Sequence, residues 1–354
     1  MEEKYEFWLC QIKYIRLKTM CELHRLIGGA KALYEAKSEE VFATVLLNKR
    51  EKEALKEAWE NNEWLSRWEE IKQRKVRFVS CFHREYPTIL RHLHRPPKCL
   101  YVKGQLPDSK ALSIAIVGAR DCTAYGRDMA RMFGYRLAEQ GIQIISGMAR
   151  GVDGWGHQGA LESGGKTYAV LASGVEVCYP PSHEKLYRSI QEHGGILSEQ
   201  PIMTEALPHY FPMRNRIISG LSHGVLVVEA KEKSGSLITA DAALEQGKDV
   251  FVIPGRIGDE LSVGCNRLIR QGAVPVLSPQ DILDYYGIQN QKKMKCLSDI
   301  ERTVLEYIGV KPIHMDELAK VISLSPTELL KVLLELHSQG EIEEVGRGYY
   351  TKKI

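Results

Sequence analysis

Seven short apolar runs recur through the middle of the chain and constrain its fold more than any other feature. Each is followed by glycine, proline or a polar turn, and segments of helical length separate them. Such alternation is typical of a parallel sheet covered by helices on both faces. We therefore predict an α/β domain over residues 76–288, a Rossmann-like, doubly wound and mostly parallel sheet. The runs are SIAIVG (113–118), IQIISG (142–147), TYAVLASG (167–174), GGILSE (194–199), GVLVVEA (224–230), DVFVIPG (249–255) and AVPVL (273–277).

The segment before this domain has helical periodicity and no proline, which predicts a small helical domain over residues 1–75, SAM-like or helix-hairpin-helix-like. Gly28-Gly29 marks a turn between two short helices. The turn either offers backbone N–H groups to a DNA phosphate or is an ordinary turn of a packing domain. Trp64 and Trp68 share one helical face, where a core position is favoured over a base-stacking platform.

The segment after it, residues 297–354, predicts a winged-helix domain entered through the polar linker 287–295. Capping boxes at 298–301 and 325–328 mark two helix starts, and a shorter helix is expected over 315–322. Two strand-like runs around a glycine turn follow. The expected outward face of the helix over 325–339 is acidic, which favours protein binding or a supporting role over reading duplex sequence. Its charged residues are Glu328, Lys331 and Glu335, followed by Glu341, Glu343 and Glu344.

The net charge of +3 and the pI of about 8.3 are too weak to indicate a chain coated in positive charge, so any polyanion site must be a local patch. Basic residues accumulate between Arg67 and Lys98, in what is either a solvated face or the border of a phosphate site. They include Lys72, Arg74, Lys75, Arg77, Arg84, Arg91 and Arg95.

The eight cysteines show neither a CxxC pair nor a metal-ligand spacing, so we expect reduced thiols and no metal. The amino terminus does not resemble a signal peptide, and no apolar stretch reaches the length of a membrane span. We therefore expect a cytoplasmic protein without a membrane partner.

The loops that follow the predicted strands are the candidate ligand sites, because ligands of such sheets bind at the carboxyl ends of the strands. Gly118 allows close approach of backbone to a phosphate, and Arg120 adds a bidentate fork. Gly147 and Gly151 shape the next loop. The loop after the first run, GARDCTAYG (118–126), is not GxGxxG, and GxxxxGK[ST] does not occur in the chain, so dinucleotide and P-loop nucleotide binding are poorly supported and no cofactor is expected.

Two later segments also place polar groups at the carboxyl ends of the predicted strands. Arg214, Asn215 and Arg216 open a helix beside Phe211, and form either an anion site or a helix-terminal salt-bridge cluster. The loop Ser234-Gly235-Ser236 opens another helix and presents N–H groups and hydroxyls to a phosphate.

Asp153 and His157 stand one helical turn apart and have two interpretations. They form either an acid/base pair or, as we favour, a helix N-cap beside a packing histidine. The sequence shows no convincing nucleophile–base pair, metal cluster or carboxylate dyad. Binding without catalysis is therefore the simplest account.

Taken in order, these loops resemble the signature of the DprA/Smf family of DNA-processing proteins. YPTILRHLHRPPKCLYVKG (86–104) also resembles the family's entry into the Rossmann-like core. The matching blocks are IVGAR (116–120), SGMARGVDGWGHQGAL (146–161), GVEVCYP (174–180), FPMRNRIISGLS (211–222), VVEAKEKSGSLITADAALEQGKDVFVIPG (227–255) and SVGCNRLIRQGA (262–273).

The resemblance implies a homodimer that binds single-stranded DNA without sequence specificity and helps load a RecA-type recombinase during natural transformation. It places the dimer contact near Leu268 and Ile269. After Tyr179-Pro180 the family commonly has a lysine that contacts DNA; this chain has none before Lys185, which is the candidate replacement for that DNA contact. The DNA contacts it implies are Gly118, Arg120, Gly147, Gly151, Arg214, Asn215 and Arg216, with Ser234, Gly235 and Ser236 less directly.

Two rival hypotheses stay open. A nucleoside-monophosphate phosphoribohydrolase of the lysine-decarboxylase-like group has a related core, but its PGGxGT loop is replaced here by EAKEKSGSLITA (229–240). A sequence-specific regulator acting through the winged helix is disfavoured by the acidic surface of that domain.

Overall fold

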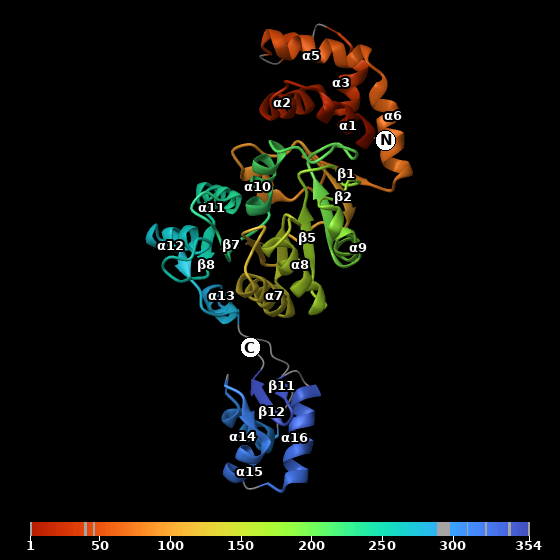
Figure 1. The fold of residues 1–354 in the computed structure, drawn as a ribbon. Helices are drawn as coiled ribbons and strands as arrows, with labels where there is room; N and C mark the ends of the chain where they lie inside the picture. Colours follow the sequence, from red (N-terminus) through yellow and green to blue (C-terminus); the bar gives the residue numbers. More distant parts are fainter. Residues whose placement is uncertain are drawn as a thin grey trace. The chain divides into compact units, whose positions relative to one another are not determined.

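The computed structural model describes residues 2–38, 41–44, 47–288, 298–309, 311–322, 324–338 and 341–352. Its contacts divide the chain into two compact units, Met1–Ile288 and Gln289–Ile354 (Figure 1). Most of the expected linker, residues 289–295, lies outside the described residues. No helix in the described ranges is both long and apolar enough to cross a membrane.

A nine-stranded sheet forms the centre of the first unit, in the order β1-β2-β6-β5-β4-β3-β7-β8-β9. The seven strands from β3 to β9 correspond to the seven apolar runs and pair in parallel, which confirms the predicted fold class. The strands are β1 (Arg77–Ser80), β2 (Cys99–Gly104), β3 (Ser113–Val117), β4 (Gln143–Ser146), β5 (Thr167–Val170), β6 (Gly195–Ser198), β7 (Gly224–Val227), β8 (Asp249–Val252) and β9 (Val274–Pro275).

Two strands were not predicted from the sequence, β1 at the edge of the sheet and β2 next to it; β1 pairs antiparallel with β2, and β2 pairs antiparallel with β6. A strand that runs opposite to its neighbour begins where that neighbour ends. Cys99, at the start of β2, therefore lies at the edge where β6 ends.

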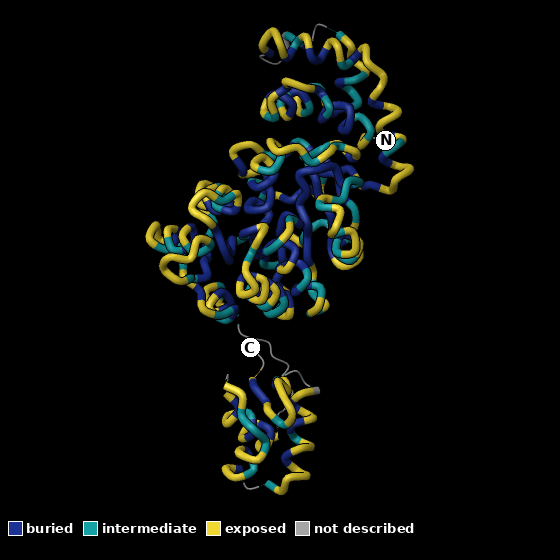
Figure 2. The backbone as a smooth tube through the Cα atoms, in the orientation of Figure 1, coloured by how far each residue is buried: buried dark blue, intermediate teal, exposed yellow. Residues whose placement is uncertain are grey.

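Alternate residues along the strands point to opposite faces of the sheet, and both faces are buried. In β3, Ile114 and Ile116 enter one core, whereas Ala115 and Val117 enter the other. The first core contains residues of α7 (Ala124–Glu139), α8 (Val152–Glu162) and α13 (Pro279–Tyr285). The second contains residues of η1 (Thr88–His92), α10 (Tyr210–Gly220), α11 (Gly235–Glu245) and α12 (Val263–Arg270). Figure 2 shows the buried strands between helices with exposed outer faces.

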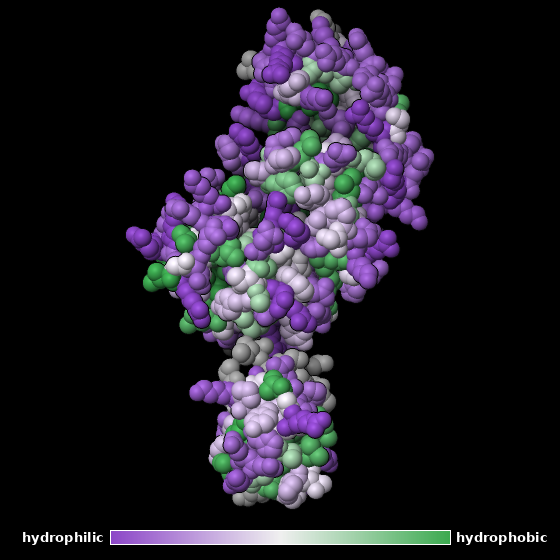
Figure 3. Space-filling view, in the orientation of Figure 1, coloured by the Kyte–Doolittle hydropathy of each residue, from purple (hydrophilic) through white to green (hydrophobic). Residues whose placement is uncertain are grey.

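Among the described residues before the sheet, six helices share a hydrophobic core with its β1–β2–β6–β5 end. Phe7 of α1 contacts Phe78 of β1 edge to face, with ring centroids 5.2 Å apart, and its ring lies 5.5 Å from that of Trp68. The outer surface of these helices is largely hydrophilic (Figure 3). They are α1 (Glu3–Gln11), α2 (Leu17–Ile27), α3 (Ala30–Ala36), α4 (Val41–Thr44), α5 (Lys49–Glu60) and α6 (Glu63–Gln73).

Trp64 and Trp68 are buried, which confirms their core interpretation. Gly28 ends α2 in the left-handed conformation, and Gly29 precedes α3, so the predicted turn is confirmed. The Glu2 carboxylate accepts the N–H of Lys31 at 3.0 Å and thereby occupies the start of α3. Phosphate binding at this turn, and a domain boundary at residue 75, stay predictions.

The second unit has the order helix, short strand, helix, helix and hairpin of a winged helix. Both predicted capping boxes are present, at Ser298–Glu301 and at Ser325–Glu328. Glu328, Lys331 and Glu335 are exposed on α16 as expected. The elements are α14 (Asp299–Tyr307), β10 (Ile313–His314), α15 (Met315–Val321), α16 (Pro326–Ser338), β11 (Ile342–Gly346) and β12 (Tyr349–Lys352), with sheet order β10-β12-β11.

We predict that Phe7→Ala lowers the free energy of unfolding by about 3–5 kcal/mol, because the lost ring bridges the helical layer and the sheet. Chemical denaturation measures the change. Leu26→Ala is the control, since Leu26 is 49% exposed and its loss should cost well under half as much. Equal effects of the two substitutions would contradict the shared core.

Candidate nucleic-acid interface

The carboxyl ends of the parallel strands carry the candidate site. A cavity of about 310 Å³, which we call the rim cavity, opens at the ends of β3 and β7 and beside α10 and α11. The strand order turns at β3, whose neighbours β4 and β7 lead into opposite halves of the sheet. Such a switch point is where doubly wound sheets bind their ligands.

The loops after β3, β4 and β7 are joined backbone to backbone. The N–H of Val152 donates to the Ala119 carbonyl at 3.2 Å, and the N–H of Ala119 donates to the Glu229 carbonyl at 2.8 Å. A side chain at Gly118 would collide with Val152, and one at Gly151 would collide with the carbonyls of Ala119 and Arg120. Gly151 also has a φ of +74°. These glycines therefore set the close approach of the loops.

Arg120 is exposed at the rim, and its guanidinium lies 4.9 Å from the centre of the Phe211 ring. Tyr179 contacts the same ring edge to face at 5.7 Å. A cation held over an aromatic face in this way is partly ordered while its donors stay available. The structure thus brings together an exposed arginine fork and two aromatic rings that can stack with bases.

Arg214 is buried, only 7% exposed, and its Nη1 and Nε atoms donate to groups of the protein. Nη1 donates to the Gly147 carbonyl at 2.7 Å and to the Val170 carbonyl, and Nε donates to Asn215 Oδ1 at 3.2 Å. Burial lowers the pKa of Arg214 to about 10, so the guanidinium stays charged at neutral pH. A side chain at Gly147 would occupy the place of this guanidinium.

The remaining rim residues line the cavity from α10 and α11. Asn215 Nδ2 donates to the Gly235 carbonyl at 3.2 Å and so ties the two helices together. Ser234 caps α11, and its hydroxyl lies 2.8 Å from that of Ser236. Four cationic side chains, Arg120, Arg214, Lys231 and Lys233, line the cavity against the carboxylates of Asp121 and Asp153.

Four of the residues predicted to contact DNA do not line the rim cavity, namely Gly147, Gly151, Lys185 and Arg216. Arg216 points away from the rim cavity and pairs with Glu199. Lys185 is exposed on α9 (Glu184–His193) and is not part of the cavity lining. Leu268, expected at a dimer surface, is 3% exposed in the second core, against which the half-buried Ile269 packs.

Sequence reasoning missed Glu229, which sits buried against the start of α7. Its carboxylate accepts the N–H of Thr123 at 2.9 Å and is also bonded to the Thr123 hydroxyl, and a side chain at Gly126 would collide with it. In dinucleotide-binding sheets a pyrophosphate occupies this helix terminus. Here a carboxylate of the protein fills that position. No local pattern marks this contact, which spans 106 residues of sequence.

Asp153 and His157 are both turned inward. Asp153 Oδ2 accepts the N–H groups of Gly147 and Ala149 at 3.1 and 3.4 Å. His157 is fully buried, with Nδ1 2.6 Å from the Thr167 hydroxyl. The predicted N-cap at Asp153 is wrong by two residues, because Gly151 precedes the helix and Asp153 bonds the loop before it. The packing interpretation of His157 is confirmed.

Comparison with protein-family models identifies the family to which this chain belongs. A family model described as DNA recombination-mediator protein A matches residues 77–287, more than half of the chain. The chain belongs to this family. A second family model, the DprA winged helix domain, matches residues 295–346.

Relatives and solved structures agree with this assignment. Protein Smf of Escherichia coli is 39% identical over 75% of this chain and 74% of its own length. DNA processing protein DprA of Bacillus subtilis is 41% identical over 60% and 72%. The X-ray structure of DNA processing protein A from Streptococcus pneumoniae superposes with a TM-score of 0.68 and 33% identity, over 79% of this chain and 97% of that chain.

The solved structure of DNA processing protein A from Helicobacter pylori superposes with a TM-score of 0.54 and 30% identity, over 60% of this chain and 95% of that chain. That structure is described as giving insight into a single-stranded-DNA binding mode.

We predict that His157 makes this member of the family acid-sensitive. Burial lowers the pKa of His157 to about 3, from 6.5. The folded state therefore favours the neutral imidazole, and its contribution to the free energy of unfolding is complete above pH 6.5. This contribution is lost as the pH falls from 6.5 toward 3, by up to about 1.4 kcal/mol per pH unit. In denaturation curves over this range, His157→Gln should start less stable at pH 7 and decline less steeply. Parallel declines of variant and wild type would disprove this role.

Proposed function

We propose that this member of the DNA recombination-mediator protein A family binds single-stranded DNA in the rim cavity without reading its sequence. The observation that carries the proposal is the exposed Arg120 held over Phe211 at a glycine-lined strand end. Phosphates take the guanidinium fork, and bases stack on Phe211 and Tyr179. The H. pylori structure, described as a single-stranded-DNA binding mode, supports the same ligand here.

Binding in this proposal involves no chemistry on the DNA. The two groups that the sequence offered as an acid/base pair, Asp153 and His157, are hydrogen-bonded to other groups of the protein, and His157 is fully buried. The phosphoribohydrolase alternative gains no support from the loop at 229–240, where Glu229 is committed to Thr123. Release of free base from AMP by the purified protein would revive that alternative.

We propose that the protein acts as a cytoplasmic homodimer and loads a RecA-type recombinase onto the DNA held at the rim. This would serve natural transformation or another recombination pathway. The family description as a recombination mediator and the relatives named DNA processing protein support this role. Because Leu268 is taken up by the second core, a dimer contact on α12 would use the outward side of that helix, next to Ile269.

We predict that Arg120→Ala weakens binding of an oligothymidylate about three- to tenfold, because an exposed charge-assisted phosphate contact is lost. Fluorescence anisotropy measures the affinity. Arg136→Ala is the matched control, since it removes an exposed arginine paired with Glu139 at the far end of α7. Circular dichroism should show native folding for both. Equal affinities of the two variants would remove Arg120 from the site.

We also predict that the protein prefers single-stranded over duplex DNA of the same length at every salt concentration. The logarithm of the affinity should fall linearly with the logarithm of salt, because phosphate contacts release counterions. A gel-shift series with both substrates measures this. Tighter binding of one particular duplex sequence would instead favour a regulator acting through the winged helix.

A further inference from the structure

A second and larger cavity, of about 840 Å³, lies between the N-terminal helices and the sheet. We call it the α2 cavity. Its walls come from α1, α2, the segment before β2, the loop after β6, and α10. The volume is in the range of sites that hold small ligands, about 300–1,000 Å³. None of the residues predicted at the rim lines it except Arg216.

The lining of the α2 cavity is strongly cationic. It contains five basic side chains, Arg16, Lys18, Arg95, Lys98 and Arg216, and one carboxylate, Glu199. Outside the lining, Glu51 neutralises Arg16 through contacts of 2.8 and 3.0 Å. Within the described ranges Lys18 and Arg95 have no ion-pair partner. The cavity therefore carries an excess of positive charge, although the net charge of the chain is small.

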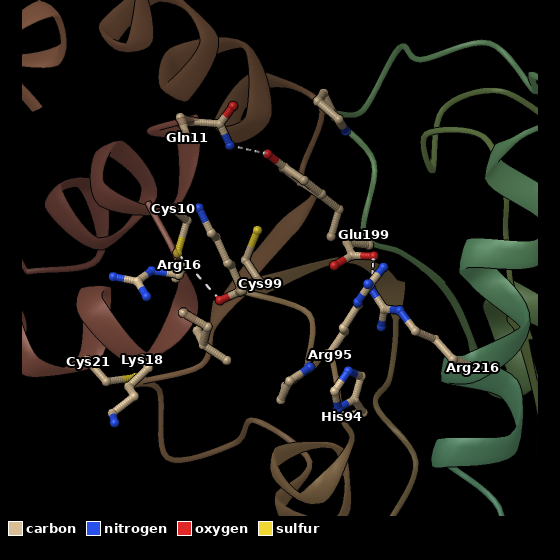
Figure 4. Close-up of a pocket in the computed structure, with 15 residues that line it drawn as sticks. Cys10, Gln11, Arg16, Lys18, Cys21, His94, Arg95, Cys99, Glu199 and Arg216 are labelled. Atoms are coloured by element: carbon tan, nitrogen blue, oxygen red, sulfur yellow. Dashed lines mark hydrogen bonds and ion pairs between the residues drawn. The ribbon is translucent and has the colours of Figure 1, made fainter. Parts of the chain in front are cut away.

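The excess is concentrated where Arg95 and Arg216 converge beside Glu199 (Figure 4). Arg216 Nη2 pairs with the carboxylate of Glu199, while its Nη1 is buried and has no hydrogen-bond partner among the described residues. One carboxylate cannot satisfy two guanidinium groups, each with five donors. A phosphate placed here would supply the missing acceptors and offset the second charge.

The α2 cavity and the rim cavity lie along the same edge of the sheet. Glu199 follows the carboxyl end of β6, and Cys99, at the start of β2, lies beside that end. The first turns of α10 reach both sites, because Arg214 and Asn215 line the rim cavity whereas Arg216 lines the α2 cavity. A chain of phosphates running past this end of α10 meets both.

We propose that the α2 cavity is a second phosphate-binding site, which holds the single strand where it leaves the rim cavity. Arg95 and Arg216 hold a phosphate, and the apolar walls at Leu17, Pro96 and Pro201 receive a base. This inference rests on the proposed binding of single-stranded DNA at the rim. It assigns a nucleic-acid contact to the junction with the N-terminal helices and gives a role to part of the basic run between Arg67 and Lys98.

The test uses the full chain and oligothymidylates from about 4 to about 30 nucleotides, with Arg95→Ala, Arg120→Ala and the control Arg136→Ala. Arg95 is exposed, so its removal should leave the fold intact, as circular dichroism would verify. Arg95→Ala should bind the shortest strands like wild type and the longest about three- to tenfold more weakly. Its salt slope for long strands should shrink by about 0.7. Arg95→Glu should lose more.

The outcomes separate the two proposals. If Arg120→Ala weakens every length while Arg95→Ala and Arg95→Glu match wild type throughout, the rim site stands and the second site is overturned. If the Arg95 variants lose affinity only for thymidine monophosphate or inorganic phosphate, the cavity is a small-anion site and the strand path is overturned. If wild type binds no single-stranded DNA, both proposals fail.

Discussion

The rim depends on the hydrogen bonds that the buried guanidinium of Arg214 donates. One of its nitrogens donates to the last carbonyl of β5 and to the Gly147 carbonyl just past β4, so a single charge ties two strand ends to α10. Strand ends leave carbonyls without partners in the sheet, and an arginine can satisfy several at once because it has five donors. Asp153 lies close enough to oppose the effect of burial on the Arg214 charge. Removing one partner from such a buried set lowers the free energy of unfolding by about 3–5 kcal/mol.

Neighbouring arginines have different surroundings in this arrangement. Arg214 donates from Nη1 and Nε to groups of the protein, Arg120 lies at the surface over an aromatic ring, and Arg216 lines a different cavity. The glycines at 118, 147 and 151 are needed by the protein's own contacts as much as by any ligand, because each leaves room for a neighbouring loop or for Arg214. The shape of the rim is therefore set by the protein's own contacts.

The sequence predicted the parallel sheet well because strands buried on both faces are almost wholly apolar, and that signal is local. It did not reveal β1 and β2, whose runs lie among basic residues and prolines. Helix periodicity alone would have separated Arg214 from Arg216, since residues two apart on a helix point to nearly opposite sides. The role of Glu229 could not be predicted from the sequence, because its contact forms only when the end of β7 meets the start of α7 in the fold.

The helical layer at the amino terminus has a practical consequence for anyone who shortens this protein. The family model begins at residue 77, which invites a truncated version that starts there. Yet Phe78 and Tyr101, both almost fully buried, belong to the hydrophobic core shared with those helices. A version cut at that boundary would present bare aromatic surface to water and would tend to aggregate. A soluble domain that starts at residue 77 would therefore need polar side chains in place of those rings.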